Sequence, residues 1–172
     1  MRRARGFTLI ELMMAVAILS ILSSLAIPWC VRYVRRARAA EAPLAIRKMY
    51  DGAVSYFVAD RADSSGKLMP RRFPGSAGPT PSSPPMGNKI AVPAGDWKTP
   101  QWSALDFTLS EPTRFSFRFD DNGQPGAAAF AQVIAQGDLD GDGVYSLYAR
   151  SCSGTSDGVS SGTAVYSVNE LE

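Results

Sequence analysis

A single carboxylate stands at the edge of the longest uncharged run in this chain of 172 residues. Glu11 is followed by twenty residues without a charge, Leu12 to Val31. A helix of that length can cross a hydrocarbon layer of about 30 Å. A carboxylate beside such a layer is costly, by about 2.5–3.5 kcal/mol at mid-membrane on insertion scales. The sequence therefore predicts that Glu11 pairs with another group.

Three further carboxylates alternate in Asp138-Leu139-Asp140-Gly141-Asp142-Gly143. Side chains at this spacing can converge on one hard cation, and the final glycine permits the sharp turn that such a loop needs. The segment resembles the first half of a calcium loop of the EF-hand or dockerin type. Calcium is the candidate cofactor, with Asp138, Asp140 and Asp142 as its candidate ligands.

The second half of this loop departs from the calcium-binding pattern. Val144 could offer a carbonyl and Ser146 a hydroxyl, but Ala149 stands where the pattern has a bidentate glutamate. A replacement carboxylate would have to come from Asp120, Asp121 or Asp157. Two interpretations stay open: a weak calcium site, with a dissociation constant of about 10⁻⁴–10⁻³ M, and a solvated hairpin turn.

The composition excludes several functional classes. The sequence has no histidine, which rules out a histidine base, a histidine-containing triad and histidine-ligated zinc or haem. The acidic residues fall in predicted turns, and we expect no enzyme activity and no cofactor other than calcium. Without Arg2, Arg3 and Arg5, 15 basic residues face 16 acidic ones. This nearly neutral body gives no reason to expect nucleic acid as the main partner.

Two cysteines, Cys30 and Cys152, are too few for a disulfide framework or a four-cysteine zinc site. Cys30 lies in or beside the apolar run, and Cys152 lies in a Ser/Gly-rich stretch near the C-terminus. A bridge would require the C-terminal body to reach back to the apolar run. We therefore expect both thiols to be unpaired.

The apolar run could be a secretory signal peptide or a plain membrane anchor. A secretory signal peptide would have a shorter core and a small-x-small cleavage site, whereas this run ends in Pro28-Trp29-Cys30-Val31-Arg32. A plain membrane anchor accounts for the length but leaves Glu11 unexplained. Arginines flank both ends, so charge does not decide the orientation. Four arginines beyond the run could face neighbouring subunits, a polyanion or lipid headgroups: Arg32, Arg35, Arg36 and Arg38.

The start of the chain, Arg5-Gly6-Phe7-Thr8-Leu9-Ile10-Glu11-Leu12-Met13, resembles the cleavage and methylation motif of type IV prepilins and the related pseudopilins. The resemblance implies cleavage between Gly6 and Phe7 by a membrane prepilin peptidase, which would also methylate the new amino group of Phe7. It implies that Glu11 helps each incoming subunit to dock. It also implies a cytoplasmic N-terminus and a C-terminal body outside the membrane.

A pairing between Glu11 and the amino group of Phe7 on a neighbouring subunit is physically reasonable. Glu11 lies one helical turn beyond Phe7, so in a stack of staggered helices its carboxylate could neutralise the ammonium of a neighbour. That attraction is stronger in hydrocarbon than in water. An intramolecular contact between Phe7 and Glu11 in a monomeric anchor is the alternative.

The expected fold is α+β, with a long N-terminal helix whose apolar half protrudes and whose second half packs on a small antiparallel sheet. Pro28 and Pro43 should bend or loosen the helix, which is expected over residues 7–59, because neither can donate a backbone hydrogen bond. The expected segments are a leader at 1–6, a membrane-spanning or filament-core half-helix at 7–31, an amphipathic half-helix at 32–60 and a globular head at 61–172.

Within the head, a proline-rich stretch at 69–100 is predicted to be a loop that packs partly through Phe73, Trp97 and Trp102. A short helical turn is expected at 102–107. The sheet should occupy 113–168. Its strands are expected at 115–119, 127–136, 144–150 and 163–168, with a turn at 120–123 and a Ser/Gly-rich loop at 151–162.

The resemblance implies a structural subunit of a type IV pilus or pilus-like fibre, serving adhesion, motility or uptake. The alternatives are a pseudopilin of a type II secretion system and a minor tip pilin that acts as an adhesin or DNA-binding module. The implied partners are other pilins, prepilin peptidase, an inner-membrane assembly platform with its ATPase and, in envelopes with two membranes, a secretin. The chain would lie in the bacterial inner membrane before assembly and in a surface pilus afterwards.

Overall fold

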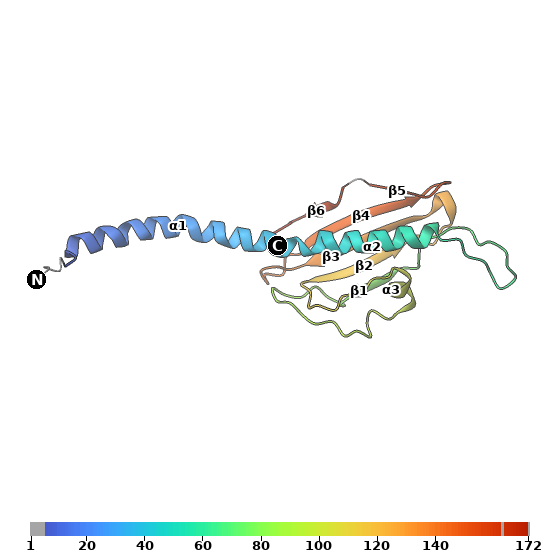
Figure 1. The fold of residues 1–172 in the computed structure, drawn as a ribbon, viewed down its shortest axis with the longest axis horizontal. Helices are drawn as coiled ribbons and strands as arrows, with labels where there is room; N and C mark the ends of the chain where they lie inside the picture. The colour runs from blue at the N-terminus through green and yellow to red at the C-terminus, as the bar shows by residue number, and fades with distance from the viewer. Residues whose placement is uncertain (1–5, 163, 172) are drawn as a thin grey trace, which may run out of the picture.

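A long helix protrudes from a β-sheet head in the computed structural model, which describes residues 6–162 and 164–171 (Figure 1). α1 spans Leu9–Ala39 and α2 spans Glu41–Val58, so the rod has one interruption, at Ala40. α1 continues without interruption through Pro28. The interruption instead falls three residues before Pro43, which has no N–H to donate to the carbonyl of Ala39.

The two helices differ in what covers them. Every side chain of α1 from Leu9 to Val34 is exposed. α2 buries one face at spacings of three and four residues, made by Ala42, Ala45, Ile46, Met49, Ala53 and Phe57. The amphipathic pattern predicted for this half of the rod is therefore confirmed, and it explains why α2 packs on the head while α1 does not.

The head is an antiparallel sheet with α2 lying across one face (Figure 1). The strand order is β1-β2-β3-β4-β5, and β6 also pairs with β4. The strands are β1 Ala77–Thr80, β2 Phe115–Asp121, β3 Phe130–Gly137, β4 Ser146–Gly154, β5 Val159–Ser161 and β6 Tyr166–Val168. A short helix α3, Pro100–Ala104, and a 3-10 turn, Gly126–Ala128, lie between strands. The predicted α+β class is confirmed.

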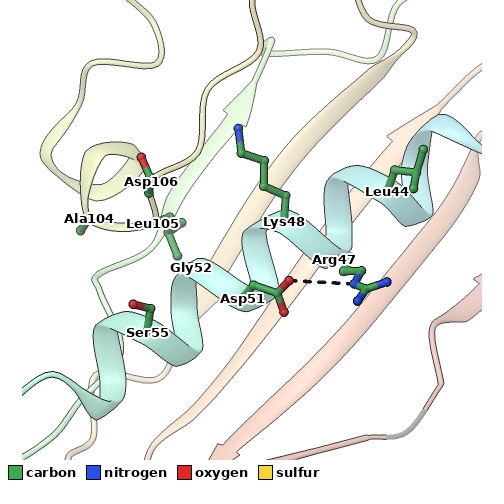
Figure 2. Close-up of a pocket in the computed structure, with 9 residues that line it drawn as sticks. All are labelled: Leu44, Arg47, Lys48, Asp51, Gly52, Ser55, Ala104, Leu105 and Asp106. Atoms are coloured by element: carbon green, nitrogen blue, oxygen red, sulfur yellow. Dashed lines mark ion pairs between the residues drawn. The ribbon is translucent and has the colours of Figure 1, made fainter.

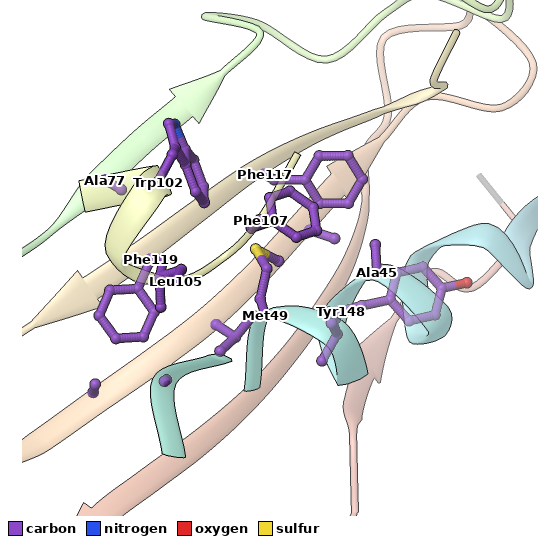
Figure 3. Close-up of a cluster of buried hydrophobic side chains, with 14 of the residues drawn as sticks. Ala45, Met49, Ala77, Trp102, Leu105, Phe107, Phe117, Phe119 and Tyr148 are labelled. Carbon is purple, nitrogen blue, oxygen red and sulfur yellow. The ribbon is translucent and has the colours of Figure 1, made fainter. Parts of the chain in front are cut away.

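The core of the head contains a cluster of aromatic side chains (Figure 3). Trp97 and Trp102 pack against each other with ring centroids 5.4 Å apart, and both contact Phe107, which in turn meets Phe117 at 5.6 Å. Phe73, Trp97 and Trp102 are each no more than 3% exposed. The proline-rich stretch therefore packs through these three residues, as predicted.

Two predicted loops contain strands. β1 lies inside 69–100, although Gly78 and Pro79 are typical of turns. Gly78 has a φ of +85°, and a Cβ there would lie 2.4 Å from the carbonyl oxygen of Phe117. The missing side chain thus lets β1 approach β2.

The predicted loop at 151–162 is also wrong, because β4 continues to Gly154 and β5 follows within it. A Cβ on Gly154 would lie 2.1 Å from the carbonyl oxygen of Gly126 and 2.8 Å from the Phe57 ring. Only a residue without a side chain fits at Gly154. Because glycine is also typical of loops, this part of β4 has the composition of a loop. Cys152 consequently lies in a strand.

Other strand ends differ from prediction. β2 continues through Asp120 and Asp121, which were expected in a turn, and β3 begins only at Phe130 because the preceding residues form the 3-10 turn. Thr163, the expected start of the last strand, lies outside the described residues. The predicted small face next to α2 is buried, namely Ala129, Ala131, Val133 and Ala135. The helical turn expected at 102–107 is α3, which begins two residues earlier and ends three residues earlier than expected.

Candidate functional site

The first turn of α1 gives Glu11 a partner within its own chain. Thr8 is the N-cap residue, and its backbone N–H and its hydroxyl donate to Glu11 Oε2 at 2.9 Å and 2.7 Å. The N–H of Glu11 donates back to Thr8 Oγ1 at 3.3 Å. This reciprocal arrangement is a capping box, which satisfies free N–H groups at a helix start.

Sequence reasoning missed the role of Thr8. The intramolecular alternative that it considered was a contact between Phe7 and Glu11, whereas Thr8 makes the contacts in the structure. The signal was present, because Thr8-Leu9-Ile10-Glu11 has the Ser/Thr-x-x-Glu spacing of a capping box. Because Glu11 remains fully accessible at this exposed helix end, its carboxylate can still accept a second donor from another molecule.

The apolar surface of α1 has no cover within the described part of the chain. Phe7 is 80% exposed, Leu9 is 77% exposed, and the large apolar side chains that follow are similarly accessible. The rod from Leu9 to Val58 contains a window long and apolar enough to cross a membrane, and none of that window is buried. A continuous apolar surface of this size requires lipid or other subunits around it. Gly6 is also exposed, with no atom within 4 Å of the place a Cβ would occupy.

The three candidate calcium ligands lie together in the β3–β4 loop. Oxygens of Asp138, Asp140 and Asp142 come within 4.8 Å of one another. Each carboxylate also has a partner from the protein. Asp138 is buried and accepts the N–H groups of Gly141 and Gly143 at 2.5 Å and 3.1 Å.

The other two carboxylates of the loop are partnered as well. Asp142 accepts the N–H of Val144 at 2.7 Å, and Asp140 pairs with Arg35 of α1 at 2.9 Å. The hydroxyl of Ser146, which the calcium interpretation would use as a ligand, donates to the carbonyl of Gly137 at 2.9 Å. The spacing that suggests a calcium loop therefore also suits a hairpin turn held by its own amides.

No replacement ligand reaches this loop from the expected residues. Asp120 and Asp121 end β2, where the register pairs Asp121 with Ala131, at the opposite end of β3 from Gly137. Asp157 lies in the β4–β5 turn, also at that distant end. At about 3.3 Å per strand residue, roughly 20 Å separate the two ends of the sheet. Asp120, Asp121 and Asp157 therefore lie too far from the loop to replace the missing bidentate ligand.

An open hollow of about 440 Å³ lies between α2 and the α3 segment (Figure 2). Its charged residues include Arg47 and Asp51, which pair at 4.0 Å and are largely exposed. A Cβ on Gly52 would lie 1.9 Å from the carbonyl oxygen of Leu105, so the hollow forms where backbone packs directly on backbone. The lining offers no buried acid–base pair.

Two further features of the sequence are typical of reactive sites: a Gly-x-Ser-x-Gly segment and the cysteines. Gly154-Thr155-Ser156-Asp157-Gly158 has the Gly-x-Ser-x-Gly spacing of a hydrolase nucleophile, but it lies in a β-hairpin rather than at a strand-to-helix elbow, and the sequence has no histidine. Both cysteines are free, as predicted: Cys30 is exposed and Cys152 is buried. Burial raises the pKa of the Cys152 thiol to about 12, which keeps it protonated and unreactive.

Comparisons with known proteins bear on the N-terminal segment. Residues 1–27 match the family described as the prokaryotic N-terminal methylation motif. The chain is 44% identical over 55 residues to the type IV major pilin protein PilA of Myxococcus xanthus (strain DK1622). That stretch is 32% of this chain and 25% of the relative, so the chain matches about a quarter of the relative's length. No solved structure matches.

Proposed function

We propose that this chain is a member of the type IV pilin family and a structural subunit of a type IV pilus or pilus-like fibre. The observation that carries the proposal is the bare apolar surface of α1 beside a head that already has its own core. A filament of such subunits buries α1 in a helical bundle and leaves the head outside. The pilin family is structural, and the proposed role requires no catalysis by the chain.

The proposed route to assembly begins with removal of residues 1–6. Cleavage after Gly6 leaves an ammonium on Phe7, and N-methylation of that amine keeps it basic. In the bundle the Phe7 ammonium of one subunit donates to Glu11 of its neighbour. Because the structure already holds the Glu11 carboxylate at the start of the helix through Thr8, the neighbour meets a fixed acceptor.

The proposed partners follow from this route. While α1 spans the inner membrane with the head outside, the chain interacts with prepilin peptidase, with an inner-membrane assembly platform and its ATPase, and with other pilins. The assembled fibre then lies at the cell surface, and passes through a secretin where the envelope has two membranes.

Microscopy and mass spectrometry of sheared surface fibres test the proposal. Abundant fibres that contain this chain, with an intact mass that begins at N-methylated Phe7, are the expected result. A retained Met1–Gly6 leader in the membrane-extracted protein would contradict it. Absence of fibres together with a secretion defect on deletion would instead assign the chain to a type II secretion pseudofibre.

A further inference from the structure

The arginines that follow the apolar span separate into two pairs by the contacts that they make. Arg35 pairs with Asp140 at 2.9 Å, and Arg38 donates to the carbonyl of Leu139 at 3.2 Å, so both are committed to the head. Arg32 and Arg36 are exposed, and neither forms an ion pair within the described residues. Glu170 shares a hollow with Arg36 but takes its hydrogen bond from the hydroxyl of Ser167.

Two exposed aromatic residues share the face of the uncommitted arginines. Trp29 is 73% exposed and Tyr33 is 75% exposed. Counted from Trp29, the next members of the face follow at three, four and seven residues: Arg32, Tyr33 and Arg36. Residues at these spacings lie on one side of a helix. We name these four residues the cationic–aromatic face.

The position of this face along α1 matches the level of lipid headgroups. Trp29 lies twenty residues beyond Leu9, which corresponds to about 30 Å of helix and to the thickness of the hydrocarbon core. Tryptophan and tyrosine are enriched where the hydrocarbon ends, because an apolar ring can remain in lipid while its N–H or O–H reaches water or a headgroup. Arg32 and Arg36 then extend into the headgroup layer.

The surface around Trp29 and Arg32 changes from apolar to cationic along the helix. A shallow hollow of about 200 Å³ is lined by Ser24, Leu25, Pro28, Trp29 and Arg32. Its membrane end is apolar and its outer end is cationic, which is the order in which a phospholipid presents its acyl chain and phosphate. The hydroxyl of Ser24 donates to the carbonyl of Ile21, so it does not add a free polar group to the apolar end.

From this arrangement we propose that the cationic–aromatic face binds the phosphate headgroup of an anionic phospholipid before the subunit enters a fibre. Arg32 and Arg36 contact the phosphate, and Trp29 and Tyr33 flank the glycerol region. The proposal rests on the proposed membrane stage of the protein. It gives the free arginines a function at the outer end of the span, where positive charge is not required for orientation.

Quenching of tryptophan fluorescence by brominated lipids tests the binding. The full chain is reconstituted in two sets of phosphatidylcholine vesicles. One set contains a small fraction of brominated phosphatidylglycerol, and the other contains the same fraction of brominated phosphatidylcholine. In both lipids the bromine lies near the headgroup end of the acyl chains. Trp97 and Trp102 are buried in the head, so quenching reports Trp29, and Trp29→Phe provides the background. We expect stronger quenching by brominated phosphatidylglycerol than by brominated phosphatidylcholine. In low salt each arginine should contribute about fivefold to this preference for phosphatidylglycerol.

The decisive variant is Arg32→Gln with Arg36→Gln, in which the preference for phosphatidylglycerol should disappear. The matched control removes two exposed arginines from the head and rod, Arg47→Gln with Arg72→Gln, and should keep the preference. Equal quenching by both lipids in the unchanged protein, or a preference that survives in the decisive variant, would overturn the inference alone. A preference that is present at low protein density and lost only when vesicles are crowded with protein would support the inference, because a second copy would then displace the lipid from the face. Quenching by neither lipid would overturn the inference together with the membrane stage.

Discussion

Asp140, in the loop between β3 and β4, pairs with Arg35 of α1 at 2.9 Å. The neighbouring Arg38 donates to the carbonyl of Leu139 in the same loop. These two contacts fix the point where the protruding helix leaves the head. They also give Asp140 a cation within its own chain, which changes how the loop would respond to calcium.

Calcium binding by Asp138, Asp140 and Asp142 remains a prediction, and Arg35 is its competitor. With a dissociation constant of about 10⁻⁴–10⁻³ M, 10 mM calcium should stabilise the protein by about 1–3 kcal/mol. Thermal melts of the full chain in detergent, with calcium and with chelator, measure the shift. Arg35→Gln frees Asp140 and should enlarge the shift.

Asp140→Ala is the control for calcium binding and should abolish the shift. Superimposable melting curves with and without calcium, or an equal shift in Asp140→Ala, would leave only the hairpin turn.

Substitutions at the start of α1 separate docking from helix capping. Glu11→Gln keeps a side chain that can close a capping box but removes the charge, so it should insert in the membrane, be processed and form few fibres. Thr8→Ala removes the cap at a cost of about 1 kcal/mol and keeps the charge, so fibres should persist. Fibre yield and the intact mass of the membrane fraction are the measurements. If Thr8→Ala loses fibres and Glu11→Gln keeps them, Glu11 acts as a cap and not in docking.

The proposed cleavage between Gly6 and Phe7 gives a testable prediction. Gly6→Val should block cleavage, because a β-branched side chain obstructs an extended peptide in a narrow protease cleft. Since the structure shows open space around Gly6, the substitution should leave the melting temperature of the head unchanged. Normal cleavage of this variant, read from its intact mass, would contradict the assigned site.

Close packing around Gly154 predicts that a larger side chain there destabilises the head, although the segment has the composition of a loop. Gly154→Ala places a methyl group against the Gly126 carbonyl and the Phe57 ring, and should destabilise the head by about 1–3 kcal/mol. Gly158→Ala, four residues further along, meets no atom within 4 Å and should change stability by less than about 0.5 kcal/mol. Chemical denaturation of both variants measures the difference, and equal stabilities would show that β4 does not pack as described.

The buried thiol of Cys152 predicts a loss of stability in alkali. Burial raises its pKa from 9.0 to about 12, so above pH 9 the unfolded chain releases the proton first. Stability from this group is complete below pH 9 and is lost as the pH rises toward 12. At pH 10.5 the loss is about 2 kcal/mol.

Cys152→Ala removes this contribution, so its melting temperature should fall less between pH 7 and pH 10.5 than that of the unchanged protein. Burial also raises the pKa of Tyr148 to about 12, but that group is present in both proteins and cancels in the comparison. Cys30→Ala is the control and should fall like the unchanged protein. Parallel curves for Cys152→Ala and the unchanged protein would contradict the burial of the thiol.

The sequence alone determined the features that depend on local pattern. The uncharged run, the segment from Gly6 to Glu11 and the spacing of buried residues in α2 predicted the long helix, its bare and packed halves and the match to the N-terminal methylation motif. Alternating phenylalanines predicted β2. These features could be predicted because helix and strand periods are set by neighbouring residues along the chain.

Only the tertiary structure decided how distant segments meet. The strands at Gly78 and Gly154 have the composition of loops, because what selects glycine there is the backbone of another segment. The same holds for the arginines after the span: Arg35 and Arg32 look equivalent in the sequence, but only Arg35 faces Asp140. Which of two like charges is neutralised depends on the direction in which the helix leaves the head, and that direction is fixed by packing between residues about a hundred positions apart.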